Sequence, residues 1–433
     1  MSSATLTQWL ERLETLHPSA MELGLERVAE VAHKLQLLPL SVPVVTVAGT
    51  NGKGSTVAVL EALLIQRGRS VGAFTSPHFQ RFNERIRVGG QEVSDEEIVA
   101  AFAAIDAARA QISLTYFEFA ALAALLVFSK RQPDVVLLEV GLGGRLDAVN
   151  IVDPQIAVIT SIDLDHQEWL GHTRGDIARE KAGIVRRNRP LVIADSVPPQ
   201  ELMECARVSG ASPVLAIGRD FRVQVDEHTW QATLVHEPGA TRQVPPRPVG
   251  ALLPENICAA LQSALLLGED FSESDLSAAL ERVAPTGRRE RRLQGGIDYI
   301  LDVAHNPAAV DKLLEYMGLS YCEGKTFAIF SVMTDKDVRT MVRAAAGRFD
   351  AWFLADQPGN TRAAAAADIA AILRDEGQQS ISISRNLRQG FRRAQSVMSP
   401  GDRLVVFGSF HTVAHVLPLL GGGTSIERSG AGL

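Results

Sequence analysis

VPVVTVAGTNGKGSTVAVLEALLIQRG, residues 42–68, is the stretch that decides the fold class. Residues 42–47 form a β-branched run that predicts a strand, a glycine-rich turn follows, and residues 56–67 have the apolar spacing of a helix. Glycines at such a turn let backbone N–H groups point at phosphate oxygens, and the start of the helix adds positive potential. We therefore predict an α/β domain with a phosphate-binding loop.

The loop itself, residues 49–56, departs from the usual P-loop pattern. That pattern has Gly where Val47 stands and Ser or Thr where Gly54 stands. A glycine turn with a solvated lysine is the alternative interpretation. The strand before the loop and the helix after it favour nucleotide binding, with Lys53 reaching the β- and γ-phosphates.

The same alternation of strands and helices continues outward along the chain. Apolar runs at residues 134–140, 155–160 and 190–194 predict buried parallel strands, and the pattern restarts after residues 284–287 with strands at 298–303, 326–331, 351–355 and 403–407. We predict an N-terminal P-loop ATPase-type domain with a mostly parallel sheet (1–284) and a C-terminal Rossmann-like α/β domain (285–433). Between the two series, residues 220–237 predict antiparallel strands and 244–248 a proline-rich loop.

The composition excludes several classes of protein. The chain has 433 residues, a net charge of −7 and 46% apolar residues, which describes a folded protein and argues against one that coats nucleic acid. Its three cysteines form no CxxC pair, so a reduced cytoplasm is expected. The longest apolar run, residues 119–128, is too short to cross a membrane.

Several separate motifs carry a resemblance to a known family. They are TSPHFQRFNERI (75–86), LEVGLGGRLDAVN (138–150), SIDLDHQEWLG (161–171), IAREKAGI (177–184) and DVAHNP (302–307), in addition to the GTNGKGS loop. In this order they resemble the Mur ligase superfamily, and within it the bacterial bifunctional dihydrofolate synthases/folylpolyglutamate synthases.

The resemblance implies an ATP-driven amide ligation with dihydropteroate, tetrahydrofolates, L-glutamate and ATP as small-molecule partners. In that reaction a substrate carboxylate attacks the γ-phosphate of ATP and becomes an acyl phosphate. An amine then displaces phosphate. The resemblance also implies Mg²⁺, and we expect a monomer with neither a nucleic-acid nor a membrane partner.

The resemblance assigns residues to the nucleotide and to the metal. Lys53, Lys181, His166 and Arg288 are expected to be catalytic, and the ATP contacts are expected at Gly49, Thr50, Asn51, Gly52, Lys53, Gly54, Ser55, Thr56, Asn256, Arg288 and Asp302. Magnesium is expected at Ser55, Ser76, Glu139 and His166. In the family the lysine that corresponds to Lys181 is carbamylated by CO₂, and a carbamate there would help to hold the metal.

The resemblance also assigns residues to the other two substrates. Folate contacts are expected at Arg81, Phe82, Phe117, Arg145 and Asp147, with residues 80–83 in a mobile loop over the pterin, and glutamate contacts at Arg85, His305 and Ser409.

Simpler roles are open for several of these residues. A lysine such as Lys181 is most often exposed, Asn256 could be a helix N-cap, and Phe117 could belong to the core. Glu139 could face solvent at a strand end, and the run Arg289, Arg291, Arg292 reads as a solvated face.

Other functions share parts of the pattern. An ordinary P-loop NTPase leaves the C-terminal α/β unit without a role. A nucleotide-dependent interaction protein would need no chemistry from Lys53 or Glu139. A folylpolyglutamate synthase without the first activity shares these motifs, and a cell-wall Mur ligase is disfavoured by the SPHFQRFNERI segment.

Overall fold

The computed structural model describes residues 4–17, 22–237, 239–284 and 286–421. Within these ranges the chain forms two compact units. The first takes in Met1–Gln224, Trp230–Pro246 and Leu253–Val283, and the second Val225–Thr229, Arg247–Leu252 and Ala284–Leu433. In the described part of the chain, no helix has the length and apolar character that crossing a membrane requires.

The first unit is built on an eight-stranded sheet in the order β4-β3-β2-β5-β1-β6-β7-β8. Its strands are β1 (Val44–Ala48), β2 (Val71–Phe74), β3 (Ile86–Val88), β4 (Gln91–Glu92), β5 (Val135–Glu139), β6 (Ile156–Ile159), β7 (Leu191–Ile193) and β8 (Val214–Ala216). Six of them are parallel, and the hairpin β3–β4 is antiparallel at one edge. The predicted mostly parallel sheet is confirmed.

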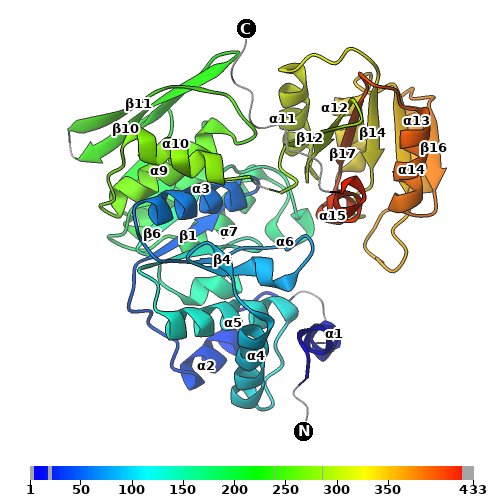
Figure 1. Cartoon of the computed structure of the whole chain (residues 1–433). Coiled ribbons are helices and arrows are strands. Elements are labelled where there is room, and N and C mark those ends of the chain that lie inside the picture. Colours follow the sequence, from blue (N-terminus) through cyan, green and yellow to red (C-terminus); the bar gives the residue numbers. More distant parts are fainter. Residues whose placement is uncertain (1–3, 18–21, 238, 285, 422–433) are drawn as a thin grey trace. The chain divides into compact units, whose positions relative to one another are not determined.

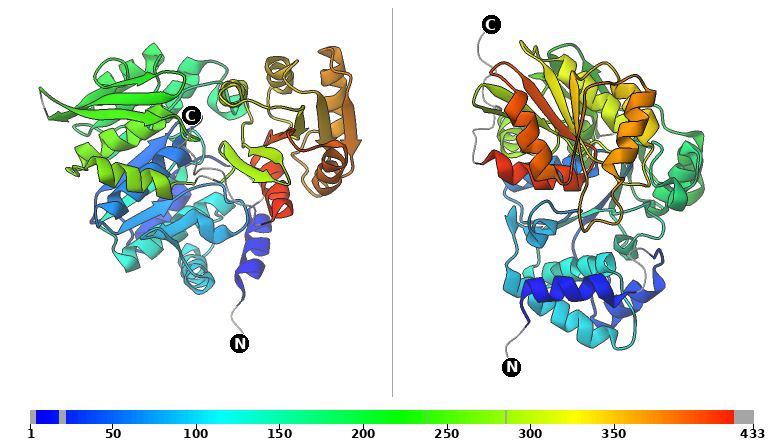
Figure 2. Two further views of the ribbon diagram at one scale, coloured as in Figure 1. Left: turned by 45° about the horizontal axis from the view of Figure 1, so that its top comes forward. Right: turned by 90° about the vertical axis from the view of Figure 1, so that its right-hand side faces the viewer.

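Helices cover both faces of this sheet (Figure 1). On one face lie α3 (Lys53–Gln66), α9 (Pro254–Leu266) and α10 (Glu273–Arg282), and on the other α4 (Asp95–Arg109) and α5 (Tyr116–Arg131), as Figure 2 also shows. Helix α3 is apolar on nearly all sides because it lies between the sheet and α9. The remaining helices are α1 (Leu6–Leu16), α2 (Glu26–Lys34), α6 (Gln167–Leu170), α7 (Arg174–Lys181) and α8 (Gln200–Ser209), with short 3₁₀ turns η1 (Phe82–Arg85), η2 (Ala148–Ile151) and η3 (Ala182–Ile184).

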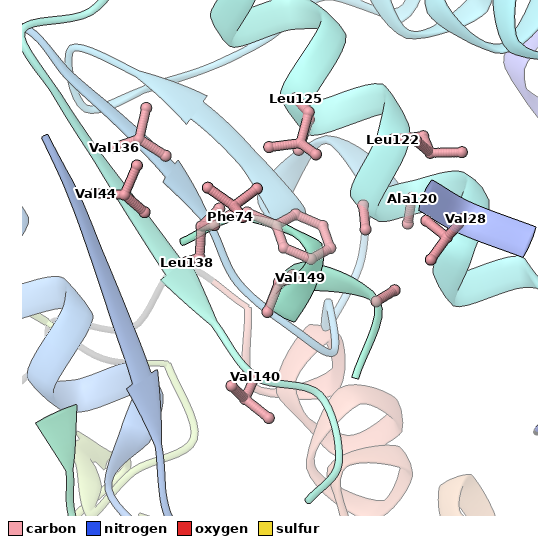
Figure 3. Close-up of a cluster of buried hydrophobic side chains, with 14 of the residues drawn as sticks. Val28, Val44, Phe74, Ala120, Leu122, Leu125, Val136, Leu138, Val140 and Val149 are labelled. Carbon is pink, nitrogen blue, oxygen red and sulfur yellow. The ribbon is translucent and has the colours of Figure 1, made fainter. Parts of the chain in front are cut away.

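A buried apolar cluster fixes the α5 face of the sheet (Figure 3). It joins side chains of β1, β2 and β5 to α2, α5 and η2, including Val28, Val44, Phe74, Leu122, Leu125, Val136, Leu138 and Val149. Burying one large apolar side chain stabilises a fold by about 1.5–3 kcal/mol. The cluster therefore holds the carboxyl ends of β2 and β5, where several site residues follow, in fixed positions.

A three-stranded antiparallel sheet follows the first eight strands. Its strands are β9 (Arg222–Val225), β10 (Thr229–Glu237) and β11 (Ala240–Pro248), in the order β11-β10-β9. The expectation of a loop at residues 244–248 is wrong, because β11 runs through them. Proline lacks the N–H that an inner strand needs, but β11 is an edge strand and tolerates Pro245 and Pro246.

The second unit contains a six-stranded sheet in the order β12-β13-β17-β14-β15-β16, parallel except for β12. Its strands are β12 (Glu290–Gln294), β13 (Ile297–Leu301), β14 (Thr326–Phe330), β15 (Ala351–Ala355), β16 (Ile381–Ser384) and β17 (Arg403–Phe407). The helices are α11 (Pro307–Gly318), α12 (Val338–Ala345), α13 (Ala366–Asp375), α14 (Leu387–Val397), α15 (Phe410–Val416) and the turn η4 (Leu417–Leu420). This confirms the predicted Rossmann-like α/β architecture.

The arginine run at the start of this unit is not a solvated face, so that expectation is wrong. Arg289 is buried, and its guanidinium lies over the ring of Tyr316, 5.4 Å from the ring centroid. Arg291 pairs with Asp298 at 2.7 Å across the β12–β13 hairpin. Arg291 and Arg292 lie in the edge strand β12, where the carboxylates of Asp298 and Glu290 pair with their charges.

Candidate functional site

The glycine loop lies at the point of the first sheet where ligands are expected. It leaves β1, whose two neighbours are β5 and β6, and the chain continues from β1 and from β6 toward opposite edges of the sheet. Loops at the carboxyl ends of such strands form the crevice in which open α/β sheets bind ligands. Thr50 N–H donates to the Ser161 carbonyl at 2.7 Å, so the loops after β1 and β6 are joined directly.

Thr160, at the end of β6, holds the loop in its shape. Its hydroxyl donates to the Asn51 carbonyl at 2.7 Å. Gly49 has φ +152°, and a Cβ there would lie only 1.7 Å from Thr160 Oγ1. Only glycine, which has no Cβ, can lie this close to the Thr160 side chain. Thr160 was not among the residues predicted from the sequence; a Thr directly after an apolar strand, beside the SIDLDH motif, is the signal that could have found it.

Two lysines meet at one carbonyl of the loop. Lys53 Nζ donates to Gly49 O at 3.0 Å, and Lys181 Nζ donates to the same oxygen at 2.9 Å. Lys181 is buried, so its alternative role as a surface lysine is wrong. Burial, and then the positive charge of Lys53, lower the pKa of Lys181 to about 7. A substantial neutral fraction at neutral pH is what carbamylation of an amine requires.

Asn256 lies against the loop from α9. A Cβ on Gly52, whose φ is +90°, would fall 2.4 Å from Asn256 Oδ1. The alternative in which Asn256 caps α9 is wrong, because the N-cap of that helix is Leu253 and Asn256 lies inside the first turn. The buried Asn256 amide therefore faces the glycine loop.

The residues expected at the metal supply oxygen ligands near the loop. Glu139 ends β5 and is only 3% exposed, so its alternative role as a solvent-facing carboxylate is wrong. Its Oε2 accepts from Ser76 N at 3.0 Å. Ser55 and Thr56 are buried in the first turn of α3, and Thr56 Oγ1 has no hydrogen-bond partner among the described residues.

His166 differs from the other residues expected at the metal because it offers a ring nitrogen and not an oxygen atom. Its backbone has φ +51° at the start of α6, and its ring lies 4.0 Å from the Asp165 carboxylate. Among the described residues, no group of three or more His, Cys, Asp or Glu side chains is arranged to hold a metal ion. A hard cation here would depend on hydroxyl oxygens and Glu139, which suits Mg²⁺.

Asp147 and Phe117 lie on the α5 side of the sheet. Asp147 is buried and accepts from Leu142 N at 2.9 Å and Val149 N at 3.1 Å, so it caps η2. Burial raises its pKa to about 6, against the lowering effect of these hydrogen bonds and of Lys53. Phe117 is half-buried; its ring packs on Phe74 with centroids 5.8 Å apart and fills the space beside Gly141. Both residues therefore have structural contacts of their own within the first unit.

The remaining residues expected at folate divide between surface and core. Arg81 is exposed and bonds Asp95 at 3.2 Å. Arg145 is also exposed and bonds Glu180 at 2.9 Å. Phe82 is buried among aromatic rings, 5.4 Å from Phe102. The structure therefore does not bring these three side chains together.

Arg85 is a buried cation. Its Nε donates to His78 Nδ1 at 2.8 Å, and the guanidinium lies 5.5 Å from the centroid of Tyr116 and 5.6 Å from that of Phe82. Burial lowers the pKa of Arg85, while Tyr116, Glu139 and Glu84 oppose that effect. A buried guanidinium of this kind suits a carboxylate ligand.

In the second unit, the predicted residues gather after two adjacent strands. The loops after β13 and β17 are joined where Gly408 N–H donates to Ala304 O at 2.9 Å. Asp302 accepts from the amides of Arg289 at 2.9 Å and Ala304 at 2.7 Å, and burial raises its pKa. The structure thus places the DVAHNP segment and residues 408–411 side by side.

One phenylalanine connects the other predicted residues of this unit. The guanidinium of Arg288 lies 5.7 Å from the Phe410 ring centroid, and the His305 ring lies 6.3 Å from it. Ser409 precedes Phe410, is buried, and caps α15 by accepting from Thr412 N at 3.1 Å. Phe410 was missed because its role is spatial; the signal that could have found it is its place directly after the predicted Ser409.

Comparison with known proteins shows where this arrangement occurs. The chain matches the Mur ligase middle domain over residues 47–263 and the Mur ligase glutamate ligase domain over residues 287–410. The dihydrofolate synthase/folylpolyglutamate synthase of Escherichia coli K12 is 39% identical over 420 residues, which are 97% of this chain and 96% of that protein. The Haemophilus influenzae protein of the same name is 37% identical over 95% of this chain and 97% of its own length.

Solved structures agree over the same length. E. coli FolC in complex with DHPP and ADP has a TM-score of 0.90 and 37% identity, covering 96% of this chain and 98% of its own. A bifunctional folylpolyglutamate synthase/dihydrofolate synthase with Mn, AMPPNP and L-glutamate bound has a TM-score of 0.87 and 39% identity, with 96% and 98% covered. The chain therefore belongs to the dihydrofolate synthase/folylpolyglutamate synthase family of the Mur ligases.

Proposed function

We propose that this protein is an ATP-dependent ligase that joins L-glutamate to dihydropteroate, giving dihydrofolate, and to reduced folates, giving polyglutamates. The observation that carries the proposal is the glycine loop, with Lys53 and Lys181 both on Gly49 O, in a chain that matches the E. coli synthase over 97% of its length. An ordinary NTPase and a cell-wall ligase are disfavoured because the curated relatives that match almost end to end are folate synthases.

The chemistry divides into two displacements. In the first, a carboxylate oxygen of the pterin substrate attacks the γ-phosphorus, ADP leaves, and an acyl phosphate forms. In the second, the amino group of glutamate attacks the acyl carbon, inorganic phosphate leaves, and the nitrogen loses a proton. In both steps negative charge is concentrated at the reacting groups. The enzyme must therefore hold positive charge close to them and exclude water.

The first unit offers groups for the phosphate side of this chemistry. We assign the phosphates to the N–H groups of residues 49–56 and to Lys53, which must exchange its bond with Gly49 O for phosphate oxygens. Mg²⁺ would neutralise phosphate charge when bound, and Ser55, Ser76, Glu139 and His166 are the residues we assign to it. The buried Glu139 carboxylate supports a cation there, as does Thr56 Oγ1, an atom beside Ser55 that has no hydrogen-bond partner among the described residues.

The carboxylate substrates need cations of their own. We assign Asp147 and the Phe117 ring to the pterin, with Arg81, Phe82 and Arg145 as further candidates, and Arg85 to the carboxylates of glutamate. We assign Asn256 of the first unit to ATP, together with Arg288 and Asp302 of the second unit. We assign His305 and Ser409, also of the second unit, to glutamate. Residues 1–284 would then act as the ATP- and folate-binding domain, and residues 285–433 as a domain that contributes ATP and glutamate contacts.

The three cysteines, Cys205, Cys258 and Cys322, are all free thiols. They support placing the reaction in the cytoplasm, where thiols are kept reduced.

A ligation assay with radiolabelled L-glutamate tests the proposal. Dihydropteroate and tetrahydrofolate are offered in separate tubes, each with and without ATP. ATP-dependent product in both tubes is expected. Product in the tetrahydrofolate tube alone would reduce the function to folylpolyglutamate synthesis, and product in neither tube would contradict the proposal.

A further inference from the structure

The segment from residue 75 to residue 85 carries several assigned residues and is organised by one carboxylate. Glu84 accepts three backbone N–H groups of its own loop: Phe79 N at 2.7 Å on Oε2, and Gln80 N and Arg81 N at 2.7 Å each on Oε1. Hydrogen bonds to a charged acceptor are about twice as strong as neutral ones. The three bonds together fix the path of the chain between Pro77 and η1.

The backbone of Glu84 closes the same loop from the other side. Its carbonyl accepts from Arg87 Nη1 at 2.8 Å, and the same Arg87 nitrogen donates to Thr75 Oγ1 at 3.0 Å. Arg87 is in turn held by Glu61 of α3 at 2.7 Å. Thr75 N–H donates to Arg85 O at 2.9 Å. The two ends of the segment are thereby tied together and to the helix that follows the glycine loop.

This arrangement differs from the expectation of a mobile loop at residues 80–83. Asn83 is buried and donates through Nδ2 to Val93 O and to Asp95 Oδ1, both at 2.8 Å. The loop is therefore ordered by side chains that do not belong to any assigned substrate contact. Glu84 makes the largest number of these bonds.

We propose that Glu84 is a positioning residue, which holds the 77–85 loop so that Arg85 and the residues around it are set for the pterin acid and glutamate before either substrate binds. The inference rests on the proposed function for its substrates. Glu84 itself touches neither reacting group. Its carboxylate acts by accepting the three backbone N–H groups, and pre-ordering them lowers the entropy lost on binding.

The substitution Glu84→Gln tests the proposal because it changes the charge and one acceptor but almost nothing of the shape. The amide can offer its oxygen to two of the three N–H groups, and its NH₂ then faces the third. Glu96→Gln, on the exposed first turn of α4, is the matched control. Glu84→Asp, which keeps the charge on a shorter side chain, is measured beside both and should change less, with the same sign.

Two readouts are taken. The first is amide hydrogen exchange of the ligand-free protein, where Glu84→Gln should speed exchange in the peptide that covers residues 79–81 by about tenfold or more, the factor expected from losing one charge-assisted hydrogen bond. Exchange in β6 should stay unchanged and shows that the fold is kept. The second is kinetics, where KM for glutamate and for the pterin acid should rise about tenfold while KM for ATP changes less than about twofold.

Exchange or KM values that match those of Glu96→Gln would overturn the proposal, as would an equal rise in all three KM values. The exchange result does not depend on turnover. A wild-type protein without ligase activity therefore counts against the proposed function, whereas an active wild type with normal Glu84→Gln kinetics counts against the role of Glu84 alone.

Discussion

Replacing Gly49 by alanine tests how tightly the glycine loop is built. An alanine Cβ would lie 1.7 Å from Thr160 Oγ1, 2.9 Å from Thr160 Cβ and 3.2 Å from Thr160 N. Contacts below 3.0 Å do not occur between real atoms of this kind, so the buried Thr160 side chain must move. When it moves, its hydroxyl loses the bonds to Asn51 O at 2.7 Å and Ala48 O at 3.3 Å.

The size of the effect follows from these contacts. Forcing a methyl group into a filled site costs about 1–3 kcal/mol. Losing the Thr160 bonds adds about 0.5–1.5 kcal/mol each, and an L-residue at φ +152° adds about 1 kcal/mol of backbone strain. We expect Gly49→Ala to lower the free energy of unfolding of the first unit by about 3–7 kcal/mol.

A matched control separates the clash from the backbone strain. Gly68 also has positive φ, +79°, but a Cβ there meets nothing within 4 Å, so Gly68→Ala should cost about 1 kcal/mol. Urea unfolding is measured for both variants, for Thr160→Ala and for the double variant Gly49→Ala/Thr160→Ala. Because Thr160→Ala removes the closest contact, the double variant should recover part of the loss, with a coupling of about 1–2 kcal/mol. Equal losses for Gly49→Ala and Gly68→Ala, or strict additivity in the double variant, would refute the reasoning.

Further predictions concern charges in both units. Lys53→Ala should lower kcat/KM in steady-state ligation assays by a factor that corresponds to about 3 kcal/mol or more of lost transition-state stabilisation. Normal turnover in this variant would contradict the phosphate role of Lys53. His305→Ala should mainly raise KM for glutamate, so an effect confined to KM for ATP would show that His305 serves the nucleotide. Because the pKa of Lys181 is lowered to about 7, the unfolded chain binds more protons than the folded chain between about pH 7 and pH 10. The free energy of unfolding, measured relative to Lys181→Met, should therefore rise with pH across that window by at most about 1.4 kcal/mol per pH unit, and a flat difference would contradict the burial of a charged amine. Arg403→Met should destabilise the second unit by about 3–5 kcal/mol, since it leaves Asp298, now bonded at 2.8 Å, without one of its buried partners; an unchanged unfolding midpoint would show that Arg291 alone suffices.

Local sequence patterns predicted much of the fold. The strand, glycine turn and helix predicted around residues 42–68 appear as β1, the loop and α3, and Ser94 with Glu97, three residues further on, forms the capping box that opens α4. The Gly89-Gly90 turn joins β3 to β4. In each case the deciding residues are neighbours in sequence, so their pattern is visible without the tertiary structure.

Features that depend on pairing between distant segments were not predicted. Thr160 supports a loop about a hundred residues earlier, and that relation exists only because β6 pairs with β1. The strand character of residues 244–248 depends on their place at a sheet edge, and β16 with α14 escaped notice because the ISIS strand is short and the helix is largely polar. Burial likewise decided between the alternatives for Lys181, which no local pattern could do.

The central claim is that the pterin carboxylate is activated by transfer of the γ-phosphoryl group before glutamate reacts. Dihydropteroate labelled with ¹⁸O in its carboxyl group tests this most directly, because breakdown of an acyl phosphate by an amine leaves one carboxyl oxygen on the released phosphate. When both carboxyl oxygens are labelled, mass spectrometry of the phosphate formed with ATP and L-glutamate should show one ¹⁸O atom in each phosphate released. Product formation with phosphate free of ¹⁸O would contradict the claim.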